Sequence, residues 1–157
     1  DKVKSTENGI IIPDMGANIL AYQDLNVGGL DCLLSYYFSD NQLWKSVYFF
    51  IEKHSNDNMY INDYLSILEK IQEKYGEPDI NEVDWSNDLY KGDASSLGFA
   101  VSIGHLSFKS EWKTKDTSIK LTLKGDNYSI EHFLSYSSLN LIDKVVEKQK
   151  QERKNDF

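Results

Sequence analysis

The sequence predicts an α+β domain with an antiparallel sheet of about five to six strands. One main helix, Met59–Tyr75, is expected to pack on a face of the sheet, and a second helix is expected at the C-terminus. Apolar residues spaced three or four apart predict the main helix. Apolar residues at every second position predict strands on both sides of it. The 157 residues are most simply read as a single domain, 1–157.

The main helix is the element that the sequence defines best. Gly76 can adopt the left-handed conformation that ends a helix, and Pro78 prevents the helix from resuming. Residues 55–58, Ser-Asn-Asp-Asn, supply candidate N-caps. Its apolar face is predicted to consist of Tyr60, Tyr64, Ile67, Leu68, Ile71 and Tyr75.

The chain before this helix predicts a β-hairpin. Leu30–Phe38 and Leu43–Lys53 both alternate, and Asp40-Asn41 between them is a typical turn sequence. The second strand is apolar on both faces, so we expect it to be central and covered on each side. A shorter first strand is expected at Ala17–Gln23.

After the helix, residues 79–93 are acidic and are expected to be irregular, with Trp85 and Tyr90 anchoring them to the body. Ala94–Gly104 fits two structures. Its alternating large and small residues suit a closely packed strand, whereas Asp93 as N-cap and Gly104 as terminator suit a short helix. The sequence does not choose between them.

Three more strands are predicted at Leu106–Thr114, Ser118–Lys124 and Tyr128–Ser137, with good turn sequences between them. Asn140 is expected to start the C-terminal helix, with Asp143 three residues later as in a capping box. Residues 147–157 are charged or polar and are expected to fray or to project into solvent. The predicted order of elements, two strands, a helix and then further strands, is compatible with a chain made of two related halves.

Charge and composition restrict the class of partner. Twenty-five acidic residues against 17 basic ones give a net charge of −8. Such a field repels phosphate backbones and anionic lipid, so nucleic acid and membrane surfaces are poor partners. The lone Cys32 excludes an intramolecular disulfide and is expected to be a small buried apolar side chain. The sequence starts at Asp1 rather than Met, so we expect a segment upstream, such as a signal peptide or lipid anchor.

No pattern of catalytic residues is present, and the chain is predicted not to be an enzyme and to use no cofactor. His54, His105 and His132 are isolated and lack zinc-ligand spacing. Asp84–Asp93 is rich in oxygen ligands and compatible with a weak calcium site, or with a solvated acidic loop. It departs from the EF-hand because Leu89 occupies the position of the required glycine.

The aromatic residues are the better guide to a binding surface. Trp44, Tyr48 and Trp85 are the candidate binding residues, since exposed aromatic side chains mark recognition sites. Trp44 is the first choice because it lies opposite the Leu43 face of its strand. Substituting Trp44 and Tyr48 is therefore expected to weaken partner binding without lowering the melting temperature much.

Several segments carry a resemblance: LSYYFSDNQLWKSVYFF (34–50), YLSILEKIQEKYGEP (64–78), GHLSFKSEWKTKDTSIKLTL (104–123) and FLSYSS (133–138). They resemble small exported proteins and lipoproteins of Gram-positive and gut bacteria, whose architecture is similar to the BamE-like and β-lactamase-inhibitor-like α+β folds. In that pattern an initial helix, here ending in DKVKSTE (1–7), precedes an antiparallel sheet. A Lys-Tyr-Gly-x-Pro helix end is followed by a Trp-x-Thr strand.

The resemblance implies an exported, non-enzymatic protein that binds a protein partner or an envelope component through its sheet, as a monomer or weak dimer. The alternative is a cytoplasmic, acidic immunity-type inhibitor of a basic toxin, since such inhibitors are often small and acidic. A small hydrolase that uses scattered carboxylates or histidines is the least favoured hypothesis.

Overall fold

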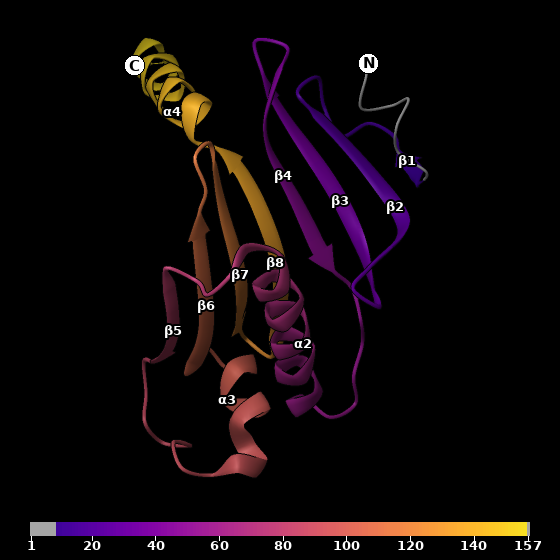
Figure 1. Ribbon diagram of the computed structural model, residues 1–157, viewed down its shortest axis with the longest axis vertical. Helices are drawn as coiled ribbons and strands as arrows, with labels where there is room; N and C mark the ends of the chain where they lie inside the picture. The colour runs from indigo at the N-terminus through magenta and orange to yellow at the C-terminus, as the bar shows by residue number, and fades with distance from the viewer. Residues whose placement is uncertain (1–8, 157) are drawn as a thin grey trace.

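The computed structural model describes residues 9–156, in which eight strands form one antiparallel sheet in the order β1-β2-β3-β4-β8-β7-β6-β5 (Figure 1). The helices of the described part are α2 (Asn58–Tyr75), α3 (Leu97–Ser102) and α4 (Leu139–Asn155), with a 3₁₀ turn, η1 (Ala94–Ser96), before α3. The strands are β1 (Ile10–Ile12), β2 (Ile19–Val27), β3 (Leu30–Ser39), β4 (Gln42–Phe50), β5 (Ile80–Trp85), β6 (Leu106–Lys113), β7 (Thr117–Asp126) and β8 (Ser129–Ser138).

The fold class is α+β, but the prediction of five to six strands is wrong. The two strands that were not predicted are β1 and β5, and β5 falls in the acidic stretch that was expected to be irregular. Both lie at the margins of the sheet, and their side chains are mostly exposed. A strand at a margin buries little, so it lacks the alternation on which prediction from sequence depends.

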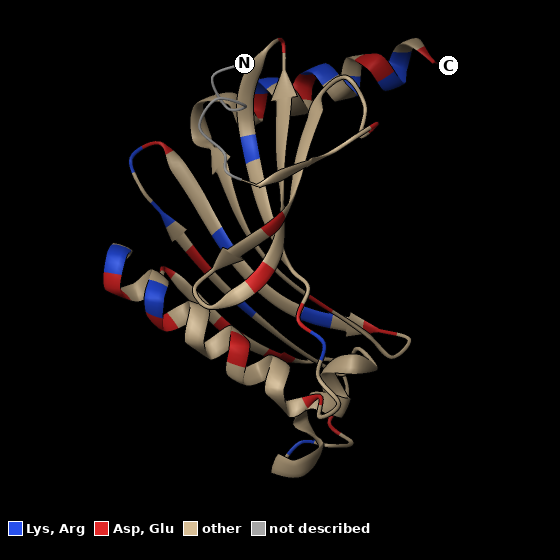
Figure 2. Ribbon diagram, turned by 90° about the vertical axis from the view of Figure 1, so that its right-hand side faces the viewer, with Lys and Arg blue, Asp and Glu red and all other residues tan. Residues whose placement is uncertain are grey.

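Two related halves are present in the topology. β1–β4 form one antiparallel meander and β5–β8 form another, and the last strands of the two, β4 and β8, pair antiparallel at the centre of the sheet. The helix between the halves, α2, covers β5–β8, whereas α4 leaves the far end of the sheet in the other direction (Figure 2).

Three of the hairpins turn on two residues that both have positive φ. These pairs are Gly28-Gly29, Asp40-Asn41 and Asn127-Tyr128. Two-residue loops with this backbone match the right-handed twist of the flanking strands. The predicted turn at Asp40-Asn41 is confirmed.

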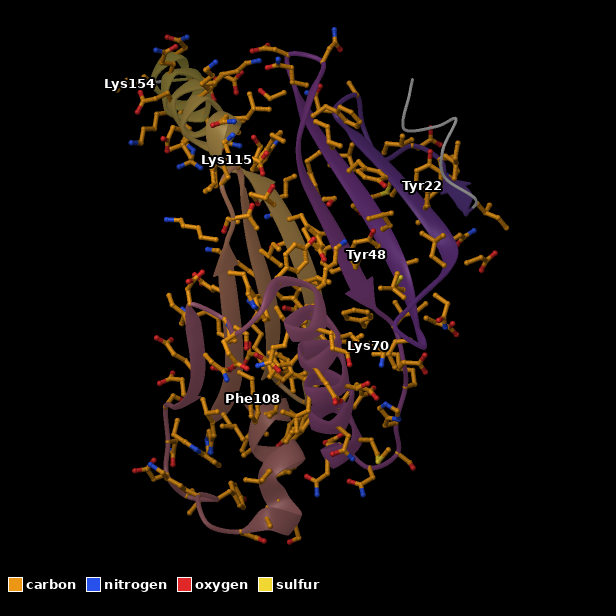
Figure 3. The ribbon with its side chains drawn as sticks, viewed as in Figure 1. Tyr22, Tyr48, Lys70, Phe108, Lys115 and Lys154 are labelled. Atoms are coloured by element: carbon orange, nitrogen blue, oxygen red, sulfur yellow. The ribbon has the colours of Figure 1, made fainter. Side chains whose placement is uncertain are left out.

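The predicted helix Met59–Tyr75 is confirmed and starts one residue earlier, at Asn58. It ends at Gly76, which has φ 81°. Trp112 on β6 donates its indole N–H to the carbonyl oxygen of Gly76 at 2.9 Å, which fixes this end of α2 to the sheet. Beneath α2 lies the main core, which contains Ile61, Tyr64, Ile67, Leu68, Ile71, Leu106, Phe108, Trp112, Ile119, Leu121, Leu123 and Leu134. Figure 3 shows Phe108 in this region.

The ambiguous segment Ala94–Gly104 is helical. Asp93 caps η1 by accepting a hydrogen bond from the backbone N–H of Ser95 at 3.1 Å. α3 packs so closely on the start of α2 that a Cβ at Gly98 would overlap the backbone of Asp57 and Asn58. The sequence pattern of this segment suited both a strand and a helix, and its close packing against α2 therefore decided in favour of the helix.

α4 differs from its prediction at the N-terminus. It begins at Leu139 rather than Asn140, and its N-cap, Ser138, makes no side-chain capping bond, so the expected capping box is wrong. Val145 is its one buried residue, and the exposed helix continues to Asn155 and projects from the sheet (Figure 2).

The expected helix end at residues 1–7 lies outside the described residues.

Candidate interaction surface

One face of the sheet lies opposite α2 and α3, and we call it the open face; among the described helices only α4 touches it, at one end, where Val145 is buried. Leu121 and Leu134 point into the core under α2, so their sequence neighbours Lys120 and Ser135 point to the opposite side. The register extends this side to Val47 on β4. β4 is central as predicted. On the open face Val47 is buried at 4% exposure, as the expected cover on each side requires, whereas Phe49 near the end of the strand is 38% exposed.

A pair of phenylalanines from the two central strands occupies the open face. Phe49 on β4 and Phe133 on β8 are register partners, and their ring centroids lie 6.1 Å apart. The ammonium of Lys124 lies 5.7 Å from the centroid of Phe133, within the range of a cation–π contact. The result is an aromatic surface formed where the two halves meet.

Charged residues flank this aromatic pair on β5–β8. Lys109 bridges Glu82 at 3.4 Å and Glu111 at 3.6 Å, and Lys120 reaches Glu111 at 3.7 Å. Glu82 and Glu111 together raise the pKa of Lys109. Exposed ion pairs of this kind contribute little to stability. Their main consequence is a polar rim beside an apolar centre, as at many recognition surfaces.

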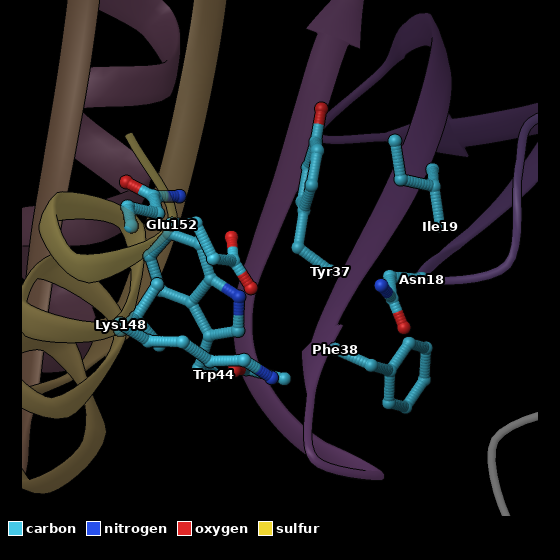
Figure 4. A pocket seen from close by; sticks show the side chains of 10 residues that line it. Asn18, Ile19, Tyr37, Phe38, Trp44, Lys148 and Glu152 are labelled. Carbon is cyan, nitrogen blue, oxygen red and sulfur yellow. The ribbon is translucent and has the colours of Figure 1, made fainter. Parts of the chain in front are cut away.

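A pocket of about 250 Å³ lies at one end of the open face, where α4 leaves the sheet (Figure 4). The rings of Tyr37 and Trp44 are 6.5 Å apart in its wall. Lys148 of α4 also lines it and forms an ion pair with Asp40 at 2.8 Å. The pocket therefore combines aromatic walls with a charged margin.

The structure does not bring the three predicted binding residues together. Trp44 lines the pocket beside α4. Tyr48 points to the α2 side of the sheet and meets Tyr136 edge to face at 6.3 Å (Figure 3). Trp85 packs against the core at the end of β5. The prediction missed Phe49 and Phe133, which become neighbours only through the long-range pairing of β4 with β8.

Each of the three histidines has its own surroundings. His54 Nε2 lies 2.6 Å from Asp63 Oδ2, at the side of α2. His132 is buried on the α2 side of β8, against the ring of Phe50 at 4.4 Å, and burial lowers its pKa to about 4. Nδ1 of His105 is buried without a hydrogen-bond partner. In the part of the chain that the structure describes, no three His, Cys, Asp or Glu side chains are grouped to hold a metal.

Two carboxylates of the candidate calcium segment have local partners, and one of them, Asp88, forms an exposed ion pair with Lys91 at 3.6 Å. Asp93 accepts hydrogen bonds from the hydroxyls of Ser95 and Ser96, both at 2.7 Å, and these bonds lower its pKa.

Cys32 is buried as expected, and burial raises the pKa of its thiol to about 11.

No known family model, curated protein or solved structure matches this chain. The fold and the surface therefore define the class: an α+β protein with one twisted antiparallel sheet, a helix-covered face and an open aromatic face. Among residues 9–156, no helix has the length and apolar character needed to cross a membrane.

Proposed function

We propose that this chain is a non-enzymatic binding module that recognises a protein partner, or a component of the bacterial envelope, through the open face of its sheet. One observation carries the proposal: Phe49 and Phe133, on the two central strands, form an aromatic pair on the face opposite α2, with Phe49 38% exposed. Aromatic anchors with a polar rim dominate the energetics of protein interfaces.

The proposal includes an exported location, which rests on the resemblance to small exported proteins and lipoproteins. Fractionation of the native cell tests it: the protein should be found in the envelope or the medium. A purely cytoplasmic protein would contradict the exported location and would leave the open-face proposal to its own test.

Site-specific photo-crosslinking tests the open face. A photoreactive phenylalanine analogue at Tyr37, on this face beside the pocket, should give one discrete adduct in the native cell. The same analogue at Leu65, which is 49% exposed on the outer side of α2, is the matched control and should give none. Equal adducts at both positions, or none at Tyr37, would contradict recognition through this face.

A second variant assigns the adduct to the aromatic pair. Phe49→Ser should reduce the Tyr37 adduct by about tenfold, as expected when an aromatic anchor at the centre of an interface is lost. Leu65→Ser should leave the adduct unchanged. A melting temperature measured for each variant confirms that the fold is intact.

The net charge of −8 also favours the alternative function, inhibition of a basic toxin in the cytoplasm. The two functions differ in the salt dependence of binding. Charge-driven inhibition weakens steeply as ionic strength rises, whereas binding centred on Phe49 and Phe133 changes much less.

A further inference from the structure

We infer that the outer edge of β5 is a second interaction surface, which pairs with an extended, basic and apolar strand of a partner protein. β5 is the last strand of the sheet, and Figure 1 shows it at the margin. No strand in the described part of the chain pairs with its outer edge. This surface lies on a different strand from Phe49 and Phe133, so the inference does not depend on the open-face proposal.

The hydrogen bonds of β5 show which backbone groups face outward. Ser86 donates its backbone N–H to the carbonyl oxygen of His105 at 2.9 Å, directly after the strand. Inward and outward groups alternate in an antiparallel ladder, so the N–H and C=O groups of Asn81, Val83 and Trp85 point away from β6. An unpaired edge of this kind is a template for an added strand.

Side chains on the two faces of β5 specify the partner. Glu82 and Asp84 lie exposed on the open-face side, so a strand laid beside them would place its own side chains within about 5 Å. Lysine or arginine at those positions would pair with Asp84 and would lie beside Glu82, whose carboxylate also faces Lys109 at 3.4 Å. On the other face Val83, which is 58% exposed, favours an apolar neighbour. The partner strand should therefore alternate basic and apolar residues.

The charge around this edge disfavours a second copy of the chain as the partner. Residues 77–93 contain six carboxylates (Glu77, Asp79, Glu82, Asp84, Asp88 and Asp93) and one lysine (Lys91). Antiparallel pairing of two β5 edges would place Glu82 and Asp84 of one copy against the same residues of the other. Like charges directly opposite each other destabilise strand pairing.

The probe for this surface is a synthetic peptide of roughly ten residues, about the length of a long strand, that alternates lysine with valine and carries a fluorescent label. Fluorescence anisotropy should show that it binds at least about tenfold more tightly than the same peptide with glutamate in place of lysine. In ¹⁵N spectra its binding should shift the amide signals of Asn81, Val83 and Trp85. Equal affinity for both peptides, or shifts confined to other strands, would overturn the inference.

Val83→Pro is the decisive variant because it removes an outward N–H and leaves the ladder with β6 intact. It should weaken binding of the lysine peptide about tenfold, whereas Val83→Thr, which keeps the N–H, should change it little. Unchanged binding by Val83→Pro would overturn the inference.

A charge-reversal variant keeps the test valid if the proline destabilises β5. Glu82→Lys with Asp84→Lys should reverse the preference, so that the glutamate peptide binds more tightly. Asp126→Lys with Asp143→Lys changes the net charge equally, away from this edge, and should keep the preference for lysine. If both double variants changed the peptide preference equally, the preference would follow net charge alone and the inference would be overturned. Dimerisation of the protein through β5, measured by sedimentation, would also overturn it.

Discussion

The hydroxyl oxygens of Tyr64 on α2 and Ser110 on β6 lie 2.6 Å apart in the buried layer between the helix and the sheet. Ser110 donates its own proton to Asn81 Oδ1 at 2.8 Å, so Tyr64 donates to Ser110. This chain of hydrogen bonds links the main helix to the marginal strand β5. It satisfies a tyrosine hydroxyl that is otherwise enclosed by apolar side chains.

Ser110→Ala should therefore cost more than Tyr64→Phe. The alanine leaves the buried hydroxyl of Tyr64 without an acceptor, which costs about 1–3 kcal/mol, whereas the phenylalanine removes the donor and should cost about 1 kcal/mol. Urea unfolding of both variants and of the double variant measures the coupling between them. Strictly additive losses would contradict a shared hydrogen bond.

Acid should destabilise the protein through His132. Burial lowers the pKa of His132 to about 4 from 6.5, so the unfolded state binds the proton first as pH falls. The contribution of the neutral ring to the free energy of unfolding is therefore fully present above pH 6.5. It decreases by about 3 kcal/mol in total as the pH falls towards 4.

His132→Phe should remove this part of the pH dependence, because it keeps a ring beside Phe50 and has no proton to bind. Unfolding free energies of both proteins between pH 7 and 4 provide the measurement. Parallel pH profiles for the two proteins would show that His132 is not the responsible group.

Gly98→Ala should be strongly destabilising. The added methyl would overlap the backbone of Asp57 and Asn58, and Gly98 also donates its N–H to Asn58 Oδ1 at 2.7 Å. Since backbone cannot move aside cheaply, a loss of roughly 1–3 kcal/mol or more is expected. Thermal unfolding measures it against Glu69→Ala, an exposed change on α2 that should be nearly neutral. A stable Gly98→Ala variant would mean that α3 packs less closely on α2.

Trp44 and Tyr48 should behave differently, although the sequence suggested the same role for both. Tyr48 packs against the core and against Tyr136, so Tyr48→Ala should cost roughly 2–3 kcal/mol. Trp44 lines the open pocket beside α4, so Trp44→Ala should cost less than about 1.5 kcal/mol. Chemical denaturation of each variant tests this order, which equal losses would contradict.

Helices and strands that bury a regularly spaced row of apolar side chains could be predicted from the sequence. α2 was predicted to within one residue because its apolar spacing, Gly76 and Pro78 all indicate the same helix. β5 could not be predicted in this way. Its sequence, INEVDW, lies at the sheet margin, where its pairing with β6 rather than burial of its side chains makes it a strand.

The candidate surface depended on tertiary structure for the same reason. Trp44, Tyr48 and Trp85 were predicted as binding residues, but Tyr48 and Trp85 pack against the core, whereas Phe49 and Phe133 meet on the open face. These two phenylalanines are separated by more than half of the chain. No local pattern indicates that β4 and β8 pair.

By itself, the sequence determined the acidic charge, the main helix and the alternating strands, because these depend on residues close together in the chain. Only the tertiary structure decided that the two meanders join through β4 and β8, that α2 covers one half, and that an aromatic face and the edge of β5 stay exposed. The physical reason is that burial of a side chain depends on which distant segment packs against it.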